Sequence, residues 1–383
     1  MNKFMLLLVL LSSVLCCGRD TGRVKRTVAD GVETVFNGID PYIIKGEPGV
    51  LRLEKDFSID TEDEARLKTG LTDIETFDVD PAGNIYLIQW NTKADYIHKF
   101  DKDGNWLKSF CRQGQGPGEI EYGGTVMITA SGKLIAKDPS QTKFLIYSQD
   151  GMFLRETRLP RILGIDHLFE DGSYLVSWQD DSDELKYYIN YVAVCDSEFE
   201  KIRELGTHQF PNSQMGENII VGQGAFIYGA SKDRIFVANS AWGYEIRVFS
   251  LNGKLLRKIR KDYRPVPIDE EFKKAFLARI PNSSQWKKLY RFAADWPPFR
   301  FLFTDDEGRL YVMTREPGPD PGEFMYDIFS AEGVFIGRTS LGNSGPSYPR
   351  TARASNGRMY SLNEKENGYK ELVVYRMIWE DER

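Results

Sequence analysis

The sequence predicts an all-β protein built from repeated, four-stranded antiparallel sheets. Short apolar stretches with period-two alternation recur along the chain, separated by turns rich in Asp, Gly and Asn. The clearest unit places strands at residues 74–79, 85–90, 96–100 and 106–111. Such alternation is typical of half-buried strands, and these turn residues readily adopt the backbone angles of tight turns.

Five further copies repeat the same order of strands and turns. They cover residues 125–157, 165–205, 225–259, 299–338 and 350–379. The sixth copy ends after three strands, whereas residues 50–59 (VLRLEKDFSI) precede the first copy and alternate like a fourth strand. Pairing the two would close a ring and remove an exposed sheet edge. We therefore predict a six-bladed β-propeller over residues 50–383, closed by its N-terminal strand.

Two segments fall outside the blade pattern. Residues 17–49 are expected to form an N-terminal linker, and residues 269–296 a helical insert between blades 4 and 5. The first helix of the insert would begin after Asp269 as N-cap and end at Pro281. A second helix is expected from the spacing of Trp286, Leu289, Ala293 and Trp296. The insert either covers apolar surface of the ring or forms a lid or docking element over the channel mouth.

Composition narrows the class of protein. The 383 residues contain 50 Lys and Arg against 56 Asp and Glu, which gives a net charge of −6. The chain therefore lacks the basic excess that nucleic-acid binding requires. With 41% hydrophobic residues it can bury a core, and no stretch after the N-terminus approaches the roughly 20 apolar residues of a membrane-spanning helix.

The N-terminus predicts export. Residues 1–16 combine Lys3 with an uncharged apolar stretch over 4–15, which has the length of a signal peptide. The following Cys-Cys-Gly resembles the lipobox of bacterial lipoproteins, and cleavage before Cys17 would leave the small Cys16 at the preceding position. We expect lipidation at Cys17 and attachment to the cell envelope through this anchor alone; a secreted soluble protein is the alternative. Cys111 and Cys195 are expected to be buried thiols.

Two motifs carry a resemblance to a known family. The blade pattern includes Asp80-Pro-Ala-Gly-Asn-Ile-Tyr86, and residues 112–119 read Arg-Gln-Gly-Gln-Gly-Pro-Gly-Glu between blades 1 and 2. Both resemble NHL-repeat propellers and the bacterial exported six-bladed propeller lipoproteins. The resemblance implies that first strands line an axial channel and that loops after second and fourth strands share the ligand-binding face. It does not imply one activity, because propellers host binding proteins, lyases and hydrolases alike.

Arginine and aromatic residues near that face are the candidate ligand-binding residues. The set comprises Arg112, Glu119, Arg161, Asp166, His167, Trp242, Trp296, Arg300, Arg315 and Arg350. An arginine cluster in an acidic chain favours a polar or anionic ligand, such as a glycan or a protein, because guanidinium groups match carboxylates and phosphates. Alternatively, each arginine pairs with a nearby acid such as Glu119, Asp166 or Glu316.

No motif for nucleophilic catalysis is present, so the sequence favours a binding module over an enzyme. The alternative is a lyase, lactonase or esterase with a metal at the channel mouth. The three histidines, His98, His167 and His208, are not expected to converge on zinc, and His167 is the best single acid–base candidate. We expect no cofactor; the acidic residues 180–184 could bind calcium but lack the glycine and terminal glutamate of a calcium loop.

Overall fold

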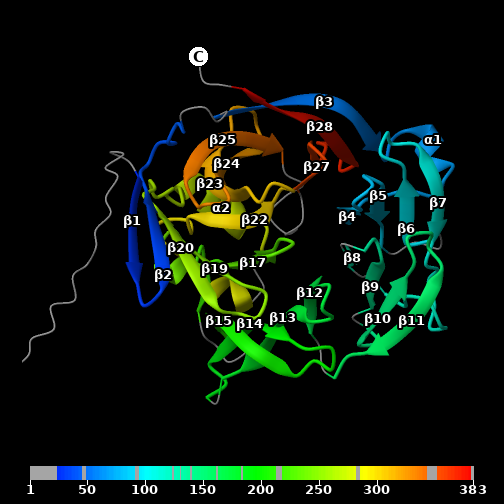
Figure 1. The fold of residues 1–383 in the computed structure, drawn as a ribbon, viewed down its shortest axis with the longest axis horizontal. Coiled ribbons are helices and arrows are strands. Elements are labelled where there is room, and N and C mark those ends of the chain that lie inside the picture. Colours follow the sequence, from blue (N-terminus) through cyan, green and yellow to red (C-terminus); the bar gives the residue numbers. More distant parts are fainter. Residues whose placement is uncertain are drawn as a thin grey trace, which may run out of the picture.

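The computed structural model shows a ring of blades around a central axis (Figure 1). It describes residues 24–44, 49–90, 95–122, 125–129, 131–138, 140–160, 163–182, 184–212, 218–281, 285–342 and 352–380. Within these ranges, no helix combines the length and apolar character needed to cross a membrane. Six four-stranded antiparallel units are present, as the repeat pattern predicts.

The strands of each blade follow one another outward from the axis. Blade 1 contains β4 (Thr76–Val79), β5 (Ile85–Ile88), β6 (Ile97–Phe100) and β7 (Trp106–Phe110). Blade 2 contains β8 (Val126–Ile128), β9 (Leu134–Asp138), β10 (Lys143–Tyr147) and β11 (Phe153–Arg158). Blade 3 contains β12 (Gly164–Leu168), β13 (Tyr174–Asp181), β14 (Tyr187–Cys195) and β15 (Lys201–Pro211).

The second half of the ring repeats this order. Blade 4 contains β17 (Phe226–Ala230), β18 (Ile235–Asn239), β19 (Glu245–Phe249) and β20 (Leu255–Lys261). Blade 5 contains β22 (Phe299–Thr304), β23 (Leu310–Pro317), β24 (Glu323–Phe329) and β25 (Phe335–Gly342). Blade 6 contains β26 (Ala352–Ser355), β27 (Arg358–Glu364), β28 (Lys370–Glu380) and β3 (Val50–Asp60). A short helix, α1 (Glu64–Leu67), leads from β3 to blade 1.

The predicted closure of the ring is confirmed. Strand β3 pairs antiparallel with β28, in a register that runs from Asp60 opposite Glu371 to Val50 opposite Glu380. At the axis, Asp78 on β4 of blade 1 forms an ion pair with Arg353 on β26 of blade 6. Its second oxygen accepts a hydrogen bond of 2.7 Å from the amide of Ile128 in blade 2. The N-terminal strand β3 thus completes blade 6, and the ion pair joins the inner strands of blades 1 and 6.

The core lies between the blades. Buried apolar side chains of the described residues form six clusters, and each cluster joins two neighbouring blades. Alternation along each strand explains this arrangement, because successive side chains face the preceding and the following blade. Cys111 and Cys195 are buried thiols within these clusters, and burial raises the pKa of Cys111 to about 12.

The N-terminal segment is not simply a linker, which corrects the expectation for residues 17–49. Residues 24–37 form a hairpin of β1 (Val24–Ala29) and β2 (Val32–Asn37), and β2 pairs parallel with β20 at the outer edge of blade 4. Val35 is fully buried there. The hairpin covers an edge that would otherwise be open, so the chain's own N-terminus protects the sheet. It lies outside the ring beside blade 4 (Figure 1).

The insert contains one of the two expected helices. Helix α2 (Glu270–Ala278) begins after Asp269, whose carboxylate accepts from the amide of Phe272. The expected second helix is wrong: residues Gln285–Lys288 form a single 3₁₀ turn, η3, and Tyr290–Phe292 form strand β21. Strand β21 pairs parallel with β16 (Ile219–Val221) from the blade 3–4 crossover. An aromatic, strand-favouring segment beside an open strand therefore overrides the helical spacing.

The apolar stripe of α2 packs on the insert itself. Phe272 makes an edge contact with Trp296, with 4.9 Å between ring centroids, and Phe276 contacts Tyr290 and Phe292 at 5.1 Å and 5.7 Å. The two ends of the insert are joined by hydrogen bonds from Ile268 to Ala294 and from Trp296 to Val266. The insert is a small aromatic unit that holds Trp296 beside blade 5.

Candidate ligand-binding site

Two arginines and two aromatic rings meet beside the insert. Arg300 lies at a bulge between β22 and β23, and Arg315 lies near the end of β23. The guanidinium carbon of Arg315 is 4.2 Å from the centroid of Trp296, and that of Arg300 is 5.0 Å from the centroid of Phe324. We call Trp296, Arg300, Arg315 and Phe324 the arginine pair site. Each guanidinium group thus lies within cation–π distance of an aromatic ring.

Neither guanidinium of this site forms an ion pair with a described residue. Both side chains are largely buried, and the Nε of Arg315 is shielded from solvent without a hydrogen-bond acceptor. Burial, and then the positive charge of Arg300, lowers the pKa of Arg315 to about 9. Burial also lowers the pKa of Arg300. The site therefore holds two charged groups at neutral pH whose desolvation is not offset by an anion.

The acid next to Arg315 is engaged elsewhere. Glu316 was the expected alternative partner, but its two oxygens accept from the two terminal nitrogens of Arg338 at 2.8 Å each. Arg338 also donates through Nε to Asp327 at 2.7 Å. This fork-shaped pairing satisfies Glu316 fully and leaves Arg315 unmatched.

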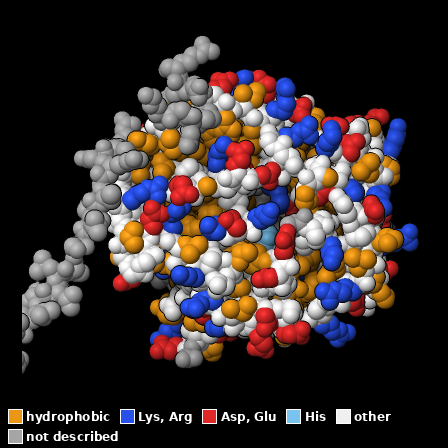
Figure 2. Space-filling model, in the orientation of Figure 1, with side chains coloured by type: hydrophobic (Ala, Val, Ile, Leu, Met, Phe, Trp, Pro, Cys, Tyr) orange, Lys and Arg blue, Asp and Glu red, His pale blue; other side chains and the backbone are white. Residues whose placement is uncertain are grey.

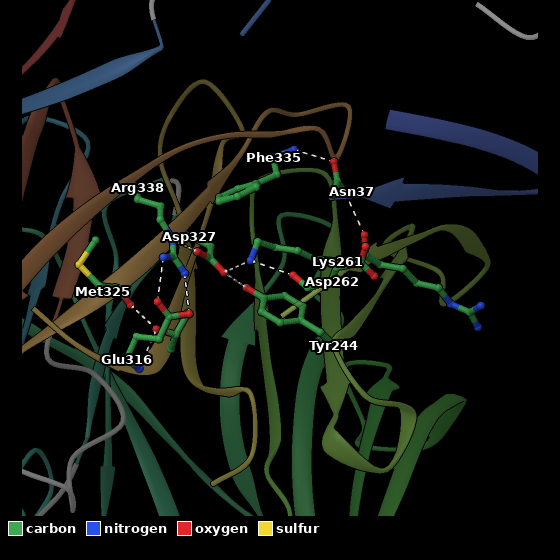
Figure 3. A network of polar contacts seen from close by, with 11 residues as sticks. Asn37, Tyr244, Lys261, Asp262, Glu316, Met325, Asp327, Phe335 and Arg338 are labelled. Atoms are coloured by element: carbon green, nitrogen blue, oxygen red, sulfur yellow. Dashed lines mark hydrogen bonds and ion pairs between the residues drawn. The ribbon is translucent and has the colours of Figure 1, made fainter. Parts of the chain in front are cut away.

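Arg338 belongs to a buried polar network between blades 4 and 5 (Figure 3). Asp327 accepts from the hydroxyl of Tyr244 at 2.7 Å and forms an ion pair with Lys261 at 3.3 Å. The positive charges of Lys261 and Arg338 therefore balance the negative charges of Asp327 and Glu316. Burial raises the pKa of Tyr244, so its hydroxyl remains a donor. We interpret this network as structural support, because its groups bind one another and because Tyr244, Lys261 and Asp327 are almost completely buried.

The network also holds the N-terminal hairpin. The side-chain amide of Asn37 donates to the carbonyls of Arg260 and Gly333, and its oxygen accepts from the amide of Phe335 at 2.8 Å (Figure 3). Asn37 thus joins β2 to both blade 4 and blade 5. This role is not evident from the sequence, because a lone asparagine after an apolar stretch is equally typical of a turn.

Other predicted site residues lie on other blades. Arg112 is highly exposed and its Nε is 3.9 Å from Asp95, while Glu119 accepts from the amide of Gly116 within its own loop. Trp242 is stacked by Arg247 at 3.5 Å, and Arg247 is itself paired with Glu245. These residues do not join the arginine pair site. Arg161, Arg350 and Cys17 lie outside the described residues.

Asp166 and His167 lie on the inner strand of blade 3. Asp166 accepts from the hydroxyl of Ser177 at 2.9 Å, and the ring of His167 lies 4.8 Å from that of Phe169. Lys137 of blade 2 is half-buried nearby; its partial burial lowers its pKa, and the charge of Asp166 opposes that shift.

Of the remaining histidines, His98 is held inside blade 1, and His208 lies between blades 3 and 4. His98 on β6 contacts Gln89 and Ser109 at 2.8 Å each, and burial lowers its pKa to about 4. His208 on β15 contacts Asn239 at 3.0 Å. Within the described ranges, no three His, Cys, Asp or Glu side chains are grouped as metal ligands. In the acidic loop, Asp180 accepts from the indole of Trp178 and Glu184 pairs with Lys186.

Charges of both signs are interspersed over the face drawn in Figure 2. No broad field of one sign appears there. Sequence reasoning identified Trp296, Arg300 and Arg315, but it missed Phe324. The available signal was that Phe324 is an aromatic residue near the start of the third strand of blade 5. Only the fold shows that it lies against Arg300.

Comparisons with known proteins agree with this fold. Residues 58–228 match the model of the DUF5128 family, described as a 6-bladed beta-propeller. A Bacteroides fragilis protein that carries the provisional name of an exported protein is 14% identical, with a TM-score of 0.51, and the similarity covers 90% of this chain and 99% of that one. No curated protein sequence matches the chain at a significant level.

Two further solved structures are more distant. A member of the DUF4221 family from Bacteroides vulgatus is 13% identical, with a TM-score of 0.46, over 87% of this chain and 99% of that one. A gluconolactonase from Xanthomonas campestris is 10% identical, with a TM-score of 0.39, over 88% of this chain and 95% of that one. The family match and the Bacteroides fragilis structure confirm that the chain is a six-bladed β-propeller, and at this identity the likeness extends to the fold alone.

Proposed function

We propose that this chain is an exported binding protein that captures carboxylate groups of an acidic glycan at the arginine pair site. The observation that carries the proposal is that Arg300 and Arg315 are stacked, largely buried and without a described carboxylate partner. A ligand carboxylate beside the two guanidinium groups would offset the repulsion between them.

A glycan is favoured over a small inorganic anion because the site also presents aromatic surface. Trp296 and Phe324 lie beside the two cations, and aromatic rings pack against the apolar face of sugar rings. Charge-assisted hydrogen bonds then select the acidic sugar. Such recognition requires no turnover, which is why binding is proposed in place of the lyase or lactonase alternative.

Polygalacturonate and its fully methyl-esterified form provide a matched pair of ligands that differ in charge. We expect the mature chain, residues 17–383 with Cys17→Ser, to bind polygalacturonate at least tenfold more tightly than the ester in calorimetry at low salt. Replacing Arg300 and Arg315 together by Gln should weaken polygalacturonate binding about ten- to hundredfold. That difference should shrink as salt screens the charges.

Arg247→Gln is the matched control, because Arg247 also stacks on a tryptophan but already has a carboxylate partner. It should leave polygalacturonate binding unchanged. Equal binding of polymer and ester, or an unaffected double variant, would contradict the proposal. Release of unsaturated sugar products, seen as rising ultraviolet absorbance, would instead support the lyase alternative.

The proposed location is the cell envelope, with a lipid anchor on Cys17. Support comes from the apolar stretch over 4–15, the Cys-Cys-Gly junction, and the provisional name of the Bacteroides fragilis protein as exported. We expect the full-length chain to incorporate a labelled fatty acid in a bacterial host, and Cys17→Ser to abolish the label. Equal labelling of the variant would refute Cys17 as the modified residue.

A further inference from the structure

The outer rim between blades 1 and 2 contains a second concave feature. A pocket of about 350 Å³ lies between the end of β7 and the start of β11. Its walls include the aromatic rings of Phe110, Tyr147 and Phe153, and Asp95 and Arg112 lie at its edge. Tyr147 is fixed by a hydrogen bond of 2.7 Å from its hydroxyl to the carbonyl of Gly118. We call this feature the rim pocket.

Exposed apolar side chains continue on both sides of the rim pocket. Trp106 and Leu107 are exposed on β7, and Met152 and Leu154 are exposed at and beside β11. Both strands lie on the outer rim of the ring (Figure 1). Aromatic and arginine side chains around a concave centre are typical of protein interfaces.

The sheet edges beside the rim pocket are available for pairing. Among described strands, β7 pairs only with β6, and β11 pairs only with β10. Blade 4 shows what such an edge can accept, because its outer strand β20 is paired by β2 of the chain's own N-terminal hairpin. Blades 1 and 2 offer the corresponding edges, which no described strand of this chain covers. An extended segment of another protein could therefore add to the rim by backbone hydrogen bonds.

Arg112 is the cationic side chain of the rim pocket, which two carboxylates also line; one of them, Glu119, accepts from the amide of Gly116 in its own loop. The side chain of Arg112 is 86% exposed, and its described carboxylate neighbour, Asp95, lies at 3.9 Å, near the outer limit of an ion pair. Such a contact contributes little, so a second carboxylate can bind this guanidinium. We propose that the rim pocket docks an extended segment of a partner protein, which inserts one apolar side chain and places an adjacent acidic side chain on Arg112.

A phage-displayed library of random twelve-residue peptides, selected on the mature Cys17→Ser chain, provides the probe. Enriched peptides should carry Asp or Glu within two positions of a large apolar residue. For a synthesised peptide of this kind, Arg112→Gln should weaken binding at least tenfold in fluorescence anisotropy, and Leu107→Glu should do the same. Arg158→Gln, an equal change of charge on β11 that does not line the pocket, should leave binding unchanged.

Hydrogen exchange of the complex locates the bound segment. Slower exchange of β7 or β11 amides on peptide binding would support the proposal, and protection confined to other blades would overturn it. Failure to enrich any peptide, enriched peptides without acidic residues, or indifference to Arg112→Gln would also overturn it.

Binding to vesicles of phosphatidylcholine and phosphatidylglycerol that depends on Leu107 but not on Arg112 would assign the apolar rim to a membrane surface instead. The double variant of Arg300 and Arg315 should bind these peptides normally, so the outcome is separate from that of the glycan proposal.

Discussion

At the scale of single residues, the turn glycines connect sequence, backbone and packing. Gly151 closes the last turn of blade 2 with a φ of +70°, and a Cβ at this position would lie 2.8 Å from the ring of Phe110 in blade 1. The corresponding turn glycine of blade 1, Gly104, approaches Phe57 of blade 6 in the same way. The recurring glycine thus permits both a left-handed backbone and close contact with the preceding blade.

Gly172 and Gly151 separate the effect of the left-handed backbone from that of close contact with the preceding blade. Gly172 has a φ of +87° but nothing within 4 Å of a Cβ. We expect Gly172→Ala to lower the free energy of unfolding by about 1 kcal/mol through backbone strain alone. Gly151→Ala should cost about 1–3 kcal/mol more, because Phe110 must move. Urea unfolding measures both values, and equal losses would show that contact between blades adds nothing.

At the scale of elements, the N-terminal hairpin behaves as part of the propeller. Its strand β2 extends the sheet of blade 4, and Asn37 bonds to the backbone of both blades 4 and 5. Glu33 on the same strand also pairs with Arg257 of β20 at 2.6 Å. This half-buried ion pair adds to the attachment of the hairpin to blade 4. We expect the buried side chain of Asn37 to contribute more to the stability of that attachment.

Removing the amide of Asn37 tests that role. Asn37→Ala should lower the free energy of unfolding by about 1–3 kcal/mol, because the buried carbonyl of Gly333 and the amide of Phe335 lose their partner. Thr34→Ala on the same strand is the control and should cost less than about 0.5 kcal/mol. If thermal and urea unfolding of the two variants coincide, the asparagine does not hold the hairpin.

These elements also show which features the sequence can predict. Period-two alternation and Asp-Gly turns locate the blades, because strand and turn chemistry is local and repeated six times. The hairpin was missed, and β21 was assigned as part of a helix. Local spacing cannot reveal either element, because β20 stabilises the hairpin and β16 stabilises β21, and both partners are distant in the sequence. Likewise, the type and position of Arg315 predict a ligand-binding residue. The sequence does not show that Glu316 pairs with Arg338 instead of Arg315, because that pairing depends on the packed fold.

At the scale of the whole molecule, stability depends on closing the ring. The two ends of the chain meet in blade 6, where β3 and β28 pair over their full length. Without β3, the outer edge of β28 would be open, and Ile59 would no longer fill the cluster between blades 6 and 1. An open apolar edge of this kind favours aggregation.

Two truncations distinguish closure from the contribution of the hairpin. Deleting residues 18–60 removes both, and we expect aggregation or a large loss of thermal stability. Deleting residues 18–44 removes the hairpin but keeps β3, so this chain should remain monomeric with a smaller decrease in Tm. Light scattering after size-exclusion chromatography and thermal unfolding report the two quantities. A monomeric chain without residues 18–60 whose Tm equals that of the shorter deletion would refute closure by β3, because the ring would then be stable with an open sixth blade.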